Sequence, residues 1–409
     1  MFLKNKSRFL YTYAFVLLLI SASYGLLVRW NFAFPMASFP YLDVVQSHSH
    51  VAFLGWGYLV SIGAIIHLFL KNAISKKGVY NYSLGIIAIS ITLMLISFPT
   101  GGYKAFSIAL LAIFGLTSYV LSYRLLVDLK GTGYALKLIR FAIYYYLLSS
   151  LATWFLAGVI LTQGKTDLYY NTVYFYLHFL YNGFFVFVLF GLLFKIFEKQ
   201  RIHISEKLLK GFFIYLNAAC IPTYALSILW SDVSSVYYVI GFAASLLQLI
   251  SLIFLVIIIK KVLLQLKWTG LSRLLLFFSL IAYGCKIILQ VLSAFPYFVE
   301  KSLALKPYFI IGYLHLFTLA FMSVFLFLIL KQLRNIKMLS KISKFGMYAF
   351  LSGVFCTELI MFLQGGFLLL RFSAIGNYNI FLFGFSALIV VGLLTIFLNQ
   401  VFKGTKSSI

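Results

Sequence analysis

Four histidines lie inside long apolar segments of this sequence of 409 residues, where an imidazole is costly and needs a partner. His48 and His50 lie two residues apart in QSHSHVAFLGWGYL, and the other two are His178 in YLHFLYN and His315 in YLHLF. A haem iron takes two axial imidazoles from separate helices, whereas zinc or copper needs three or four nitrogen or sulfur ligands close together. The alternative is that each imidazole only hydrogen-bonds a neighbouring carbonyl group or tyrosine.

The composition indicates which elements hold these histidines. Hydrophobic residues make up 63% of the chain and charged residues 10%, and the mean hydropathy is +1.03. A soluble domain has far more charged surface, so the sequence predicts an all-α, polytopic integral membrane protein. A spanning helix needs about 20 apolar residues. On that basis the chain forms a single transmembrane domain, 1–409, with twelve spans at 9–30, 46–70, 80–99, 104–126, 138–162, 168–196, 207–230, 235–263, 270–295, 307–331, 345–370 and 377–401.

Lysine and arginine are distributed unevenly between the two sides of this predicted bundle. With the N-terminus in the cytoplasm, 26 of them fall on the inner side and six on the outer side, and Lys286 lies inside a helix. The bias follows the positive-inside rule, so we expect a bacterial-type inner (plasma) membrane protein with both termini cytoplasmic. The formal net charge of +25 then reflects topology and contact with membrane lipid, and it does not indicate nucleic-acid binding.

The four histidines belong to the second, sixth and tenth predicted helices, which all run from the outside inward. At about 1.5 Å per residue, His50, His315 and His178 lie roughly 7, 12 and 15 Å from the starts of their helices. The sequence therefore predicts one layer of imidazoles in the outer half of the membrane. The other two histidines, His67 and His203, are expected at the inner surface in contact with water.

His48 and His50 cannot both face the same iron, because helical residues two apart point about 200° apart. His50 is favoured because it lies deeper in the helix and shares its arc with Phe53, Leu54 and Gly57. Gly57 would let a flat macrocycle approach the backbone closely.

The arrangement resembles subunit I of the haem–copper oxidases, which has twelve helices with histidines in the second, sixth and tenth. The run HSHVAFLGW also resembles helix two of the quinol- and nitric-oxide-reductase-like members and of the NnrS family. The resemblance covers the whole chain as topology, and a handful of residues carry it. It implies an oxidase-like bundle in which His50 (or His48) and His315 hold one low-spin haem b.

The chain departs from that family at the second metal centre. Tyr313 stands where the family has the histidine of its catalytic haem, and His178 matches one copper ligand without the Pro-Glu that usually follows it. The paired histidines of the seventh helix have no counterpart between Glu206 and Trp230. We therefore expect no copper, assign no catalytic residue, and do not expect oxygen reduction by the family's mechanism.

Two isolated charges lie deep in apolar sequence, Lys286 in AYGCKIILQ and Glu358 in FCTELIMFLQGG. They can pair with each other, since buried membrane charges usually pair. Otherwise Lys286 can hold a haem propionate and Glu358 can relay protons. Tyr181 and Asn182 are polar groups of the kind that more often joins helices than forms a site.

The sequence thus predicts a haem-binding membrane protein that carries electrons or handles a gas or quinol. Its expected partners are quinol, a cytochrome or other respiratory subunits, and whether it is an oxidoreductase component stays open. One alternative is a transporter or metal-handling protein whose histidines bind substrate or copper. Transporters often have helices broken by glycine or proline, and here only Pro222 falls well within a span. Another alternative is a structural subunit of a membrane complex without cofactors.

Overall fold

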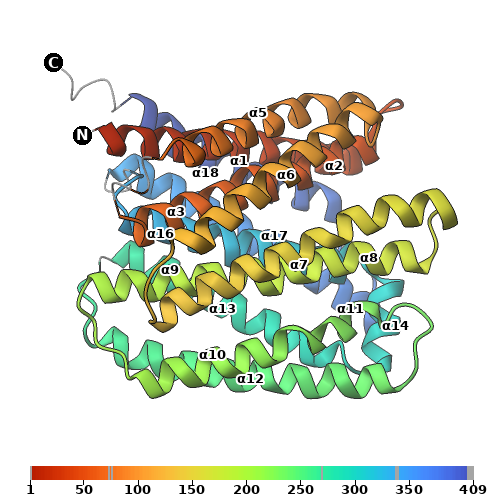
Figure 1. Ribbon diagram of the computed structural model, residues 1–409. Helices are drawn as coiled ribbons and strands as arrows, with labels where there is room; N and C mark the ends of the chain where they lie inside the picture. Colours follow the sequence, from red (N-terminus) through yellow and green to blue (C-terminus); the bar gives the residue numbers. More distant parts are fainter. Residues whose placement is uncertain (1, 72–73, 75–76, 269, 337–339, 403–409) are drawn as a thin grey trace. The chain divides into compact units, whose positions relative to one another are not determined.

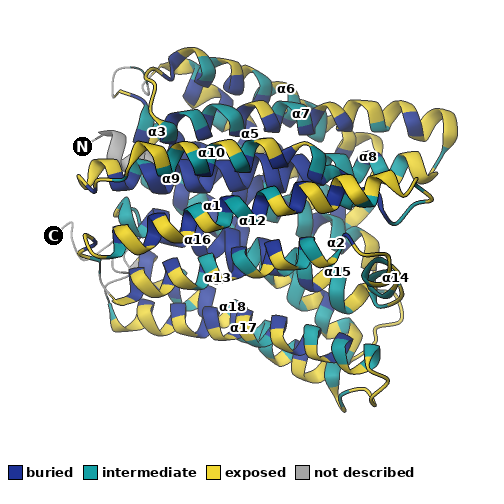
Figure 2. Cartoon of the chain, turned by 90° about the horizontal axis from the view of Figure 1, so that it is seen from below, coloured by how far each residue is buried: buried dark blue, intermediate teal, exposed yellow. Residues whose placement is uncertain are grey.

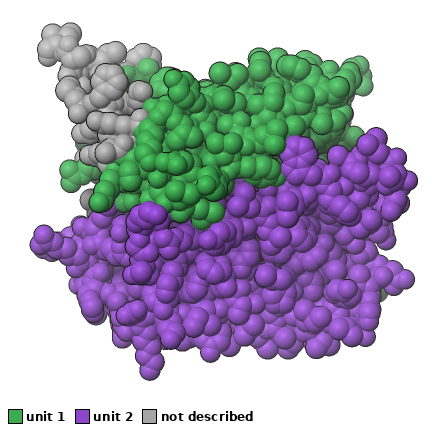
Figure 3. Space-filling view, in the orientation of Figure 1, with its two compact units in different colours: residues 1–128, 323–409 green, residues 129–322 purple. Residues whose placement is uncertain are grey.

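The computed structural model describes residues 2–71, 74, 77–268, 270–336 and 340–402. In these ranges the chain is helical, without a strand. It divides into two compact units, one of residues 1–128 and 323–409 and one of residues 129–322 (Figure 3). Both units consist of apolar helices, and a single transmembrane domain over 1–409 stays a prediction.

The first unit contains the N-terminal helices and the C-terminal helical hairpin (Figure 1). Its elements are α1 (Phe2–Ala33), α2 (Tyr41–His50), η1 (Val51–Tyr58), α3 (Leu59–Phe69), α5 (Gly78–Gly101), α6 (Ala105–Asp128), α16 (Val324–Gln332), α17 (Lys341–Leu369) and α18 (Tyr378–Phe402).

The second unit is the middle of the chain, and it holds the bent and the short helices. Its elements are α7 (Tyr134–Gln163), α8 (Asp167–His178), η2 (Phe179–Phe185), α9 (Val186–Lys199), α10 (Glu206–Cys220), η3 (Pro222–Tyr224), α11 (Ala225–Ile228), α12 (Val236–Leu263), α13 (Gly270–Leu292), α14 (Pro296–Ala304), α15 (Lys306–His315) and η4 (Leu316–Ser323). Only Ser323, the last residue of η4, belongs to the first unit.

The predicted multi-helix membrane architecture is confirmed. Among the described residues, eleven helices are long and apolar enough to cross a membrane, and a bent pair makes the number twelve if it forms one span. Such segments become helices because a helix satisfies its backbone hydrogen bonds internally where no water can. The second span begins at Tyr41, five residues earlier than predicted. The short helix α14 was not predicted.

The seventh predicted span, 207–230, is a bent pair and not one straight helix. Helix α10 ends at Cys220, Pro222 begins η3, and the two parts meet at an angle of 45°. Proline causes such a break because it has no N–H to donate and its ring clashes with the carbonyl group four residues earlier.

Close backbone contact joins α17 and α18 in the first unit. A Cβ added at Gly392 of α18 would lie 2.5 Å from the backbone nitrogen of Phe350 and 2.6 Å from the backbone oxygen of Gly346, both on α17. Gly353, one heptad after Gly346, meets the backbone of Ile389 in the same way. Small residues at this spacing let membrane helices approach each other closely.

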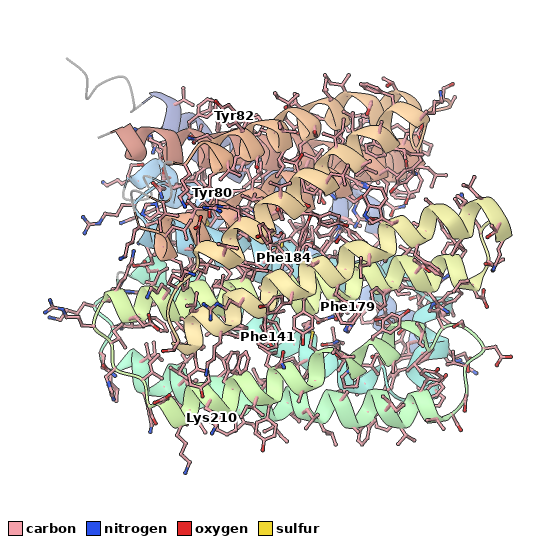
Figure 4. The ribbon with its side chains drawn as sticks, viewed as in Figure 1. Tyr80, Tyr82, Phe141, Phe179, Phe184 and Lys210 are labelled. Atoms are coloured by element: carbon pink, nitrogen blue, oxygen red, sulfur yellow. The ribbon has the colours of Figure 1, made fainter. Side chains whose placement is uncertain are left out.

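A charged cluster fixes the ends of α5 and α6. The buried carboxylate of Asp128 lies 3.3 Å from Nζ of Lys77 and 3.1 Å from Nε of Arg124, and it accepts a hydrogen bond from Tyr80. Two residues further along α5, Tyr82 is 76% exposed (Figure 4). The two tyrosines therefore mark the packed and the outward faces of α5.

Candidate functional site

Three of the four predicted histidines occupy the same place in their helices. His50 ends α2, His178 ends α8 and His315 ends α15, and a π-helical segment follows each of them directly. These histidines are the tenth, twelfth and tenth residues of their helices. At about 1.5 Å per residue, each lies roughly 14–17 Å along its own helix from the helix start, a narrower range than the 7–15 Å predicted from the sequence. π-Helical turns are rare and occur frequently at functional sites.

A short sequence repeat accompanies the π-helical segments η1, η2 and η4. The three runs read HVAFLGW, HFLYNGF and HLFTLAF, with a small residue and then an aromatic residue at the fifth and sixth positions after histidine. These pairs are Gly55–Trp56, Gly183–Phe184 and Ala320–Phe321. The sequence prediction missed this repeat, and the spacing of histidine, small residue and aromatic residue is the signal that could have found it.

The histidine-bearing spans are the most buried of the described spans. Their most apolar stretches are 78%, 94% and 72% buried, against at most 61% for the other eight unbroken spans. In Figure 2, α9, which continues the helix after His178, is almost wholly in the buried colour. Helices with such little exposed surface are suited to holding an internal site rather than to facing lipid.

His48 is held against helix α1. Its Nδ1 atom lies 2.7 Å from the backbone oxygen of Ser21, so Nδ1 carries the proton, because a carbonyl oxygen only accepts. The ring also packs on Gly25, where an added Cβ would lie 2.9 Å from Cε1 of His48. In the described part of the chain no hydrogen bond uses Nε2 of His48. That nitrogen keeps a free lone pair.

His50 has a partner for each ring nitrogen. Its Nδ1 atom donates to the backbone oxygen of Gln46 at 2.9 Å, and its Nε2 atom lies 3.1 Å from the hydroxyl group of Tyr103, which donates to it. The ring stacks on Phe98 at a centroid distance of 4.7 Å. Binding of a metal by His50 would therefore require Tyr103 to give up its hydrogen bond.

His178 belongs to a polar network inside the second unit. Its Nε2 atom donates to the backbone oxygen of Cys220 at 2.8 Å, and its Nδ1 atom accepts from Asn182 at 3.3 Å and from Ser227 at 3.4 Å. The side-chain oxygen of Asn182 in turn accepts from the amine of Lys286, which is 1% exposed. The sequence analysis left open a neighbouring carbonyl group or tyrosine as a partner, and the carbonyl group of Cys220 is the one found.

The network extends to the break at Pro222. Thr223 donates to the backbone oxygens of Ala219 and Cys220, and Gln248 of α12 donates to Thr223 at 3.4 Å. His178 and Thr223 thus supply donors to a carbonyl group at the end of α10, where the regular helix stops. Irregular backbone at membrane depth is tolerated where neighbouring groups satisfy it in this way.

Aromatic stacking joins the segments that follow His178 and His315. Tyr181 of η2 stacks on Phe317 of η4 with a centroid distance of 5.0 Å and an angle of 21°. Phe179 and Phe184, also of η2, lie inside the same unit (Figure 4). His315 is half-buried and takes part in a contact of its own.

The predicted pairings between sites stay predictions. His48 and His50 belong to the first unit and His315 to the second, and the same division separates Glu358 from Lys286. Within its own unit, Glu358 is buried and neither of its carboxylate oxygens has a hydrogen-bond partner among the described residues. Arg29 of α1 contacts Met361, one turn after Glu358 on α17, through Nη2 at 3.5 Å.

A zinc or copper site needs three or four ligands grouped together. Among the described residues, no three side chains of His, Cys, Asp or Glu are grouped closely enough to hold a metal ion. A two-histidine haem site does not need such a group. The comparisons with known proteins add no assignment, since no family model matches the chain and no curated protein is similar to it in sequence.

Proposed function

We propose that this protein is a haem-binding integral membrane protein with an oxidase-like helix arrangement, in which His315 and one histidine of α2 are the iron ligands. It would lie in a bacterial-type inner membrane with both termini cytoplasmic, as the 26-to-6 distribution of basic residues supports. Its role would be electron transfer, or gas or quinol handling, beside quinol, a cytochrome or other respiratory subunits.

The observation that carries the proposal is that three buried helices each have a histidine at an equivalent position, and that on α2 a second histidine, His48, lies two residues before it. Each histidine ends an α-helical segment about three turns from its start and precedes a π-helical segment. A histidine that only fills a gap between helices has no need to precede a π-helical segment, and here the same arrangement occurs in three helices. A layer of imidazoles does need rigid, buried helices that present the side chains at one depth.

The donor chemistry on α2 fits iron ligation best at His48. A metal-bound histidine usually donates its other ring N–H to a carbonyl group or carboxylate, which fixes the tautomer and raises the basicity of the ligand. The hydrogen bond from Nδ1 of His48 to the Ser21 backbone has this form. His50, favoured by the sequence, has Tyr103 on the nitrogen that would bind, so we now favour His48 as the α2 ligand.

The chain's own residues would orient and shield this cofactor. When bound, a haem with two histidine ligands supplies a one-electron carrier with no open position for oxygen. Ser21 would orient His48, and the buried aromatic residues after each histidine would exclude water. Lys286 remains a candidate for holding an anionic group of the cofactor. His178 has its two ring nitrogens bonded within the protein, so its role would be to hold the break at Pro222.

An absorption spectrum of the purified protein tests the proposal. We expect a reduced-minus-oxidised spectrum typical of haem b with two histidine ligands, lost in His315→Ala and in His48→Ala and kept in His50→Ala. Loss of this spectrum in His50→Ala, with the spectrum kept in His48→Ala, would still support a haem and would make His50 the α2 ligand. Haem-free protein from haem-replete cells would contradict the proposal.

The bent helix favours a second candidate, a transporter. Broken helices with free backbone groups near the middle of the membrane form the substrate sites of many transporters. Here α10 and α11 meet at Pro222, and His178, Asn182 and Lys286 lie in the same network. Haem-free protein whose melting temperature rises with an added small anion would support this candidate.

A further inference from the structure

Helix α17 carries a buried carboxyl group without a partner. Glu358 is 6% exposed, and neither of its oxygens meets a hydrogen-bond donor among the described residues. The residues after it are apolar on the packed side, where Met361 joins Leu382 of α18 in a buried cluster. Among the described residues, neither a hydrogen-bond donor nor an ion-pair partner compensates a negative charge at this carboxyl group.

The ionisation state of Glu358 follows from this environment. An ionised carboxylate without hydrogen bonds is far more costly in an apolar interior than the neutral acid, and membrane-buried groups neutralise or pair for this reason. The surroundings of Glu358 therefore favour the neutral acid, which holds one proton.

Arg29 lies in the same unit, and most of its N–H groups have no acceptor among the described residues. Its guanidinium group contacts Met361, one turn after Glu358 on α17, but Arg29 and Glu358 are not among the ion pairs of the described chain. The only hydrogen bond of Arg29 in the described residues goes from Nη2 to the sulfur of Met361, at 3.5 Å. A thioether is a weak acceptor, so most of the five N–H donors of the guanidinium group remain available.

The other titratable groups near this pair, among the described residues, are Tyr378, Tyr41 and the proposed ligand His48. Tyr378 begins α18, and Tyr41 and His48 belong to α2. Among the described residues, no second carboxylate interacts electrostatically with Glu358 or Arg29. Arg29 is itself half-buried near the end of α1. The pair thus consists of one carboxyl group and one cation, and Arg29 is the more exposed of the two residues.

We propose that Glu358 is a proton-exchange site, which holds a proton while Arg29 is apart from it and releases that proton when the guanidinium group reaches the carboxylate. In the release step the O–H bond of Glu358 breaks, the proton passes to water beside Arg29, and the carboxylate accepts the N–H groups of Arg29. The fork of a guanidinium group matches a carboxylate and makes such a contact strong. Uptake of a proton reverses the step.

This inference stands apart from haem binding. Glu358, Arg29 and Met361 belong to one unit, and none of them is a proposed ligand. The protein can exchange a proton at Glu358 with or without a cofactor, so failure of one proposal leaves the other in place.

Infrared spectroscopy of the whole purified protein in lipid tests the site. The chain has only eight Asp and Glu residues, so the carbonyl stretch of a protonated acid can be assigned by substitution. We expect such a band at neutral pH, lost in Glu358→Gln and retained in Glu300→Gln, whose carboxylate is exposed and paired with Lys301. The band should shift in D₂O, because the proton exchanges.

Removing the cation tests the role of Arg29. In Arg29→Gln the acid band should persist to higher pH, with a titration midpoint about one pH unit or more above that of the wild type. Absence of the band, a band that does not shift in D₂O, or an unchanged midpoint would overturn the proposal. If a variant fails to fold, the wild-type protein can still be tested with a lipid-soluble carbodiimide, which reacts with protonated buried acids. We expect this reagent to modify Glu358. An unmodified Glu358 would count against the site.

Discussion

The Nδ1 atom of His48 lies 2.7 Å from the backbone oxygen of Ser21, and this contact determines which ring nitrogen is free. Because Nδ1 donates, the lone pair is on Nε2. His50, two residues later, is bonded through Nδ1 and Nε2 alike. Two neighbouring histidines that look equivalent in sequence therefore have different capacities to bind iron.

Displacing the His48 ring should lower haem binding. A Cβ at residue 25 would lie 2.9 Å from Cε1 of His48, so Gly25→Leu pushes the ring away from Ser21. We expect a loss of about tenfold or more in haem affinity, the size typical when an outer partner of a metal ligand is disturbed. The measurement is haem titration of the apoprotein, followed by the absorption spectrum.

Gly85→Leu is the matched control for that substitution. Gly85 lies on α5 of the same unit, and a Cβ there would meet no atom within 4 Å. Its haem affinity should equal that of the wild type. Full haem binding by Gly25→Leu would argue against His48 as the ligand.

The stability of the protein should depend on the hydrogen bond between Lys286 and Asn182. Asn182→Leu leaves the Lys286 amine without its acceptor, and an unsatisfied buried donor costs about 1–3 kcal/mol, more if charged. Removing the amine as well, in Asn182→Leu/Lys286→Met, should recover part of this loss. Thermal unfolding of the two variants in detergent measures the difference.

Lys210 provides the comparison for the lysine substitution. It is exposed on α10 of the same unit (Figure 4), so Lys210→Met should change the unfolding free energy by no more than about 0.5 kcal/mol. Equal melting temperatures for Asn182→Leu and the double variant would mean that Asn182 does not support Lys286.

The sequence predicted the apolar helices well because hydropathy depends only on composition along the chain. The bend in the seventh span was not predicted, although Pro222, which cannot continue a helix, was the signal for it. The partners of the polar residues could not be predicted in the same way. Tyr103 follows His50 by 53 residues and Asn182 precedes Lys286 by 104, so their meeting depends on helix packing. The π-helical segments were not predicted either, although the repeat of a small and an aromatic residue after each histidine is present in the sequence.

The contact between α17 and α18 should tolerate no side chain at Gly392. Leucine there would meet the backbone of Phe350 and Gly346, and backbone cannot move aside as a flexible side chain can. We expect Gly392→Leu to lower the unfolding free energy by about 1–3 kcal/mol, the usual cost of overpacking. Gly384→Leu, on the same helix with nothing within 4 Å of its Cβ, should be close to neutral in the same thermal unfolding measurement. Equal losses in the two variants would show that close approach is not the cause.

The bent pair of α10 and α11 should cross the membrane as one span. Residues 206–228 at about 1.5 Å each extend roughly 35 Å, enough for a hydrocarbon core of about 30 Å even with the 45° bend. A crossing gives twelve spans and puts both termini on one side, as the charge distribution predicts, whereas a re-entrant pair gives eleven and separates them. Reporter fusions after Ile204 and after Asp232 should therefore report opposite sides, with fusions after Lys77 and Lys104, which flank α5, as the reference for a full crossing. The same side for Ile204 and Asp232 would make the pair re-entrant and overturn the predicted position of the C-terminus.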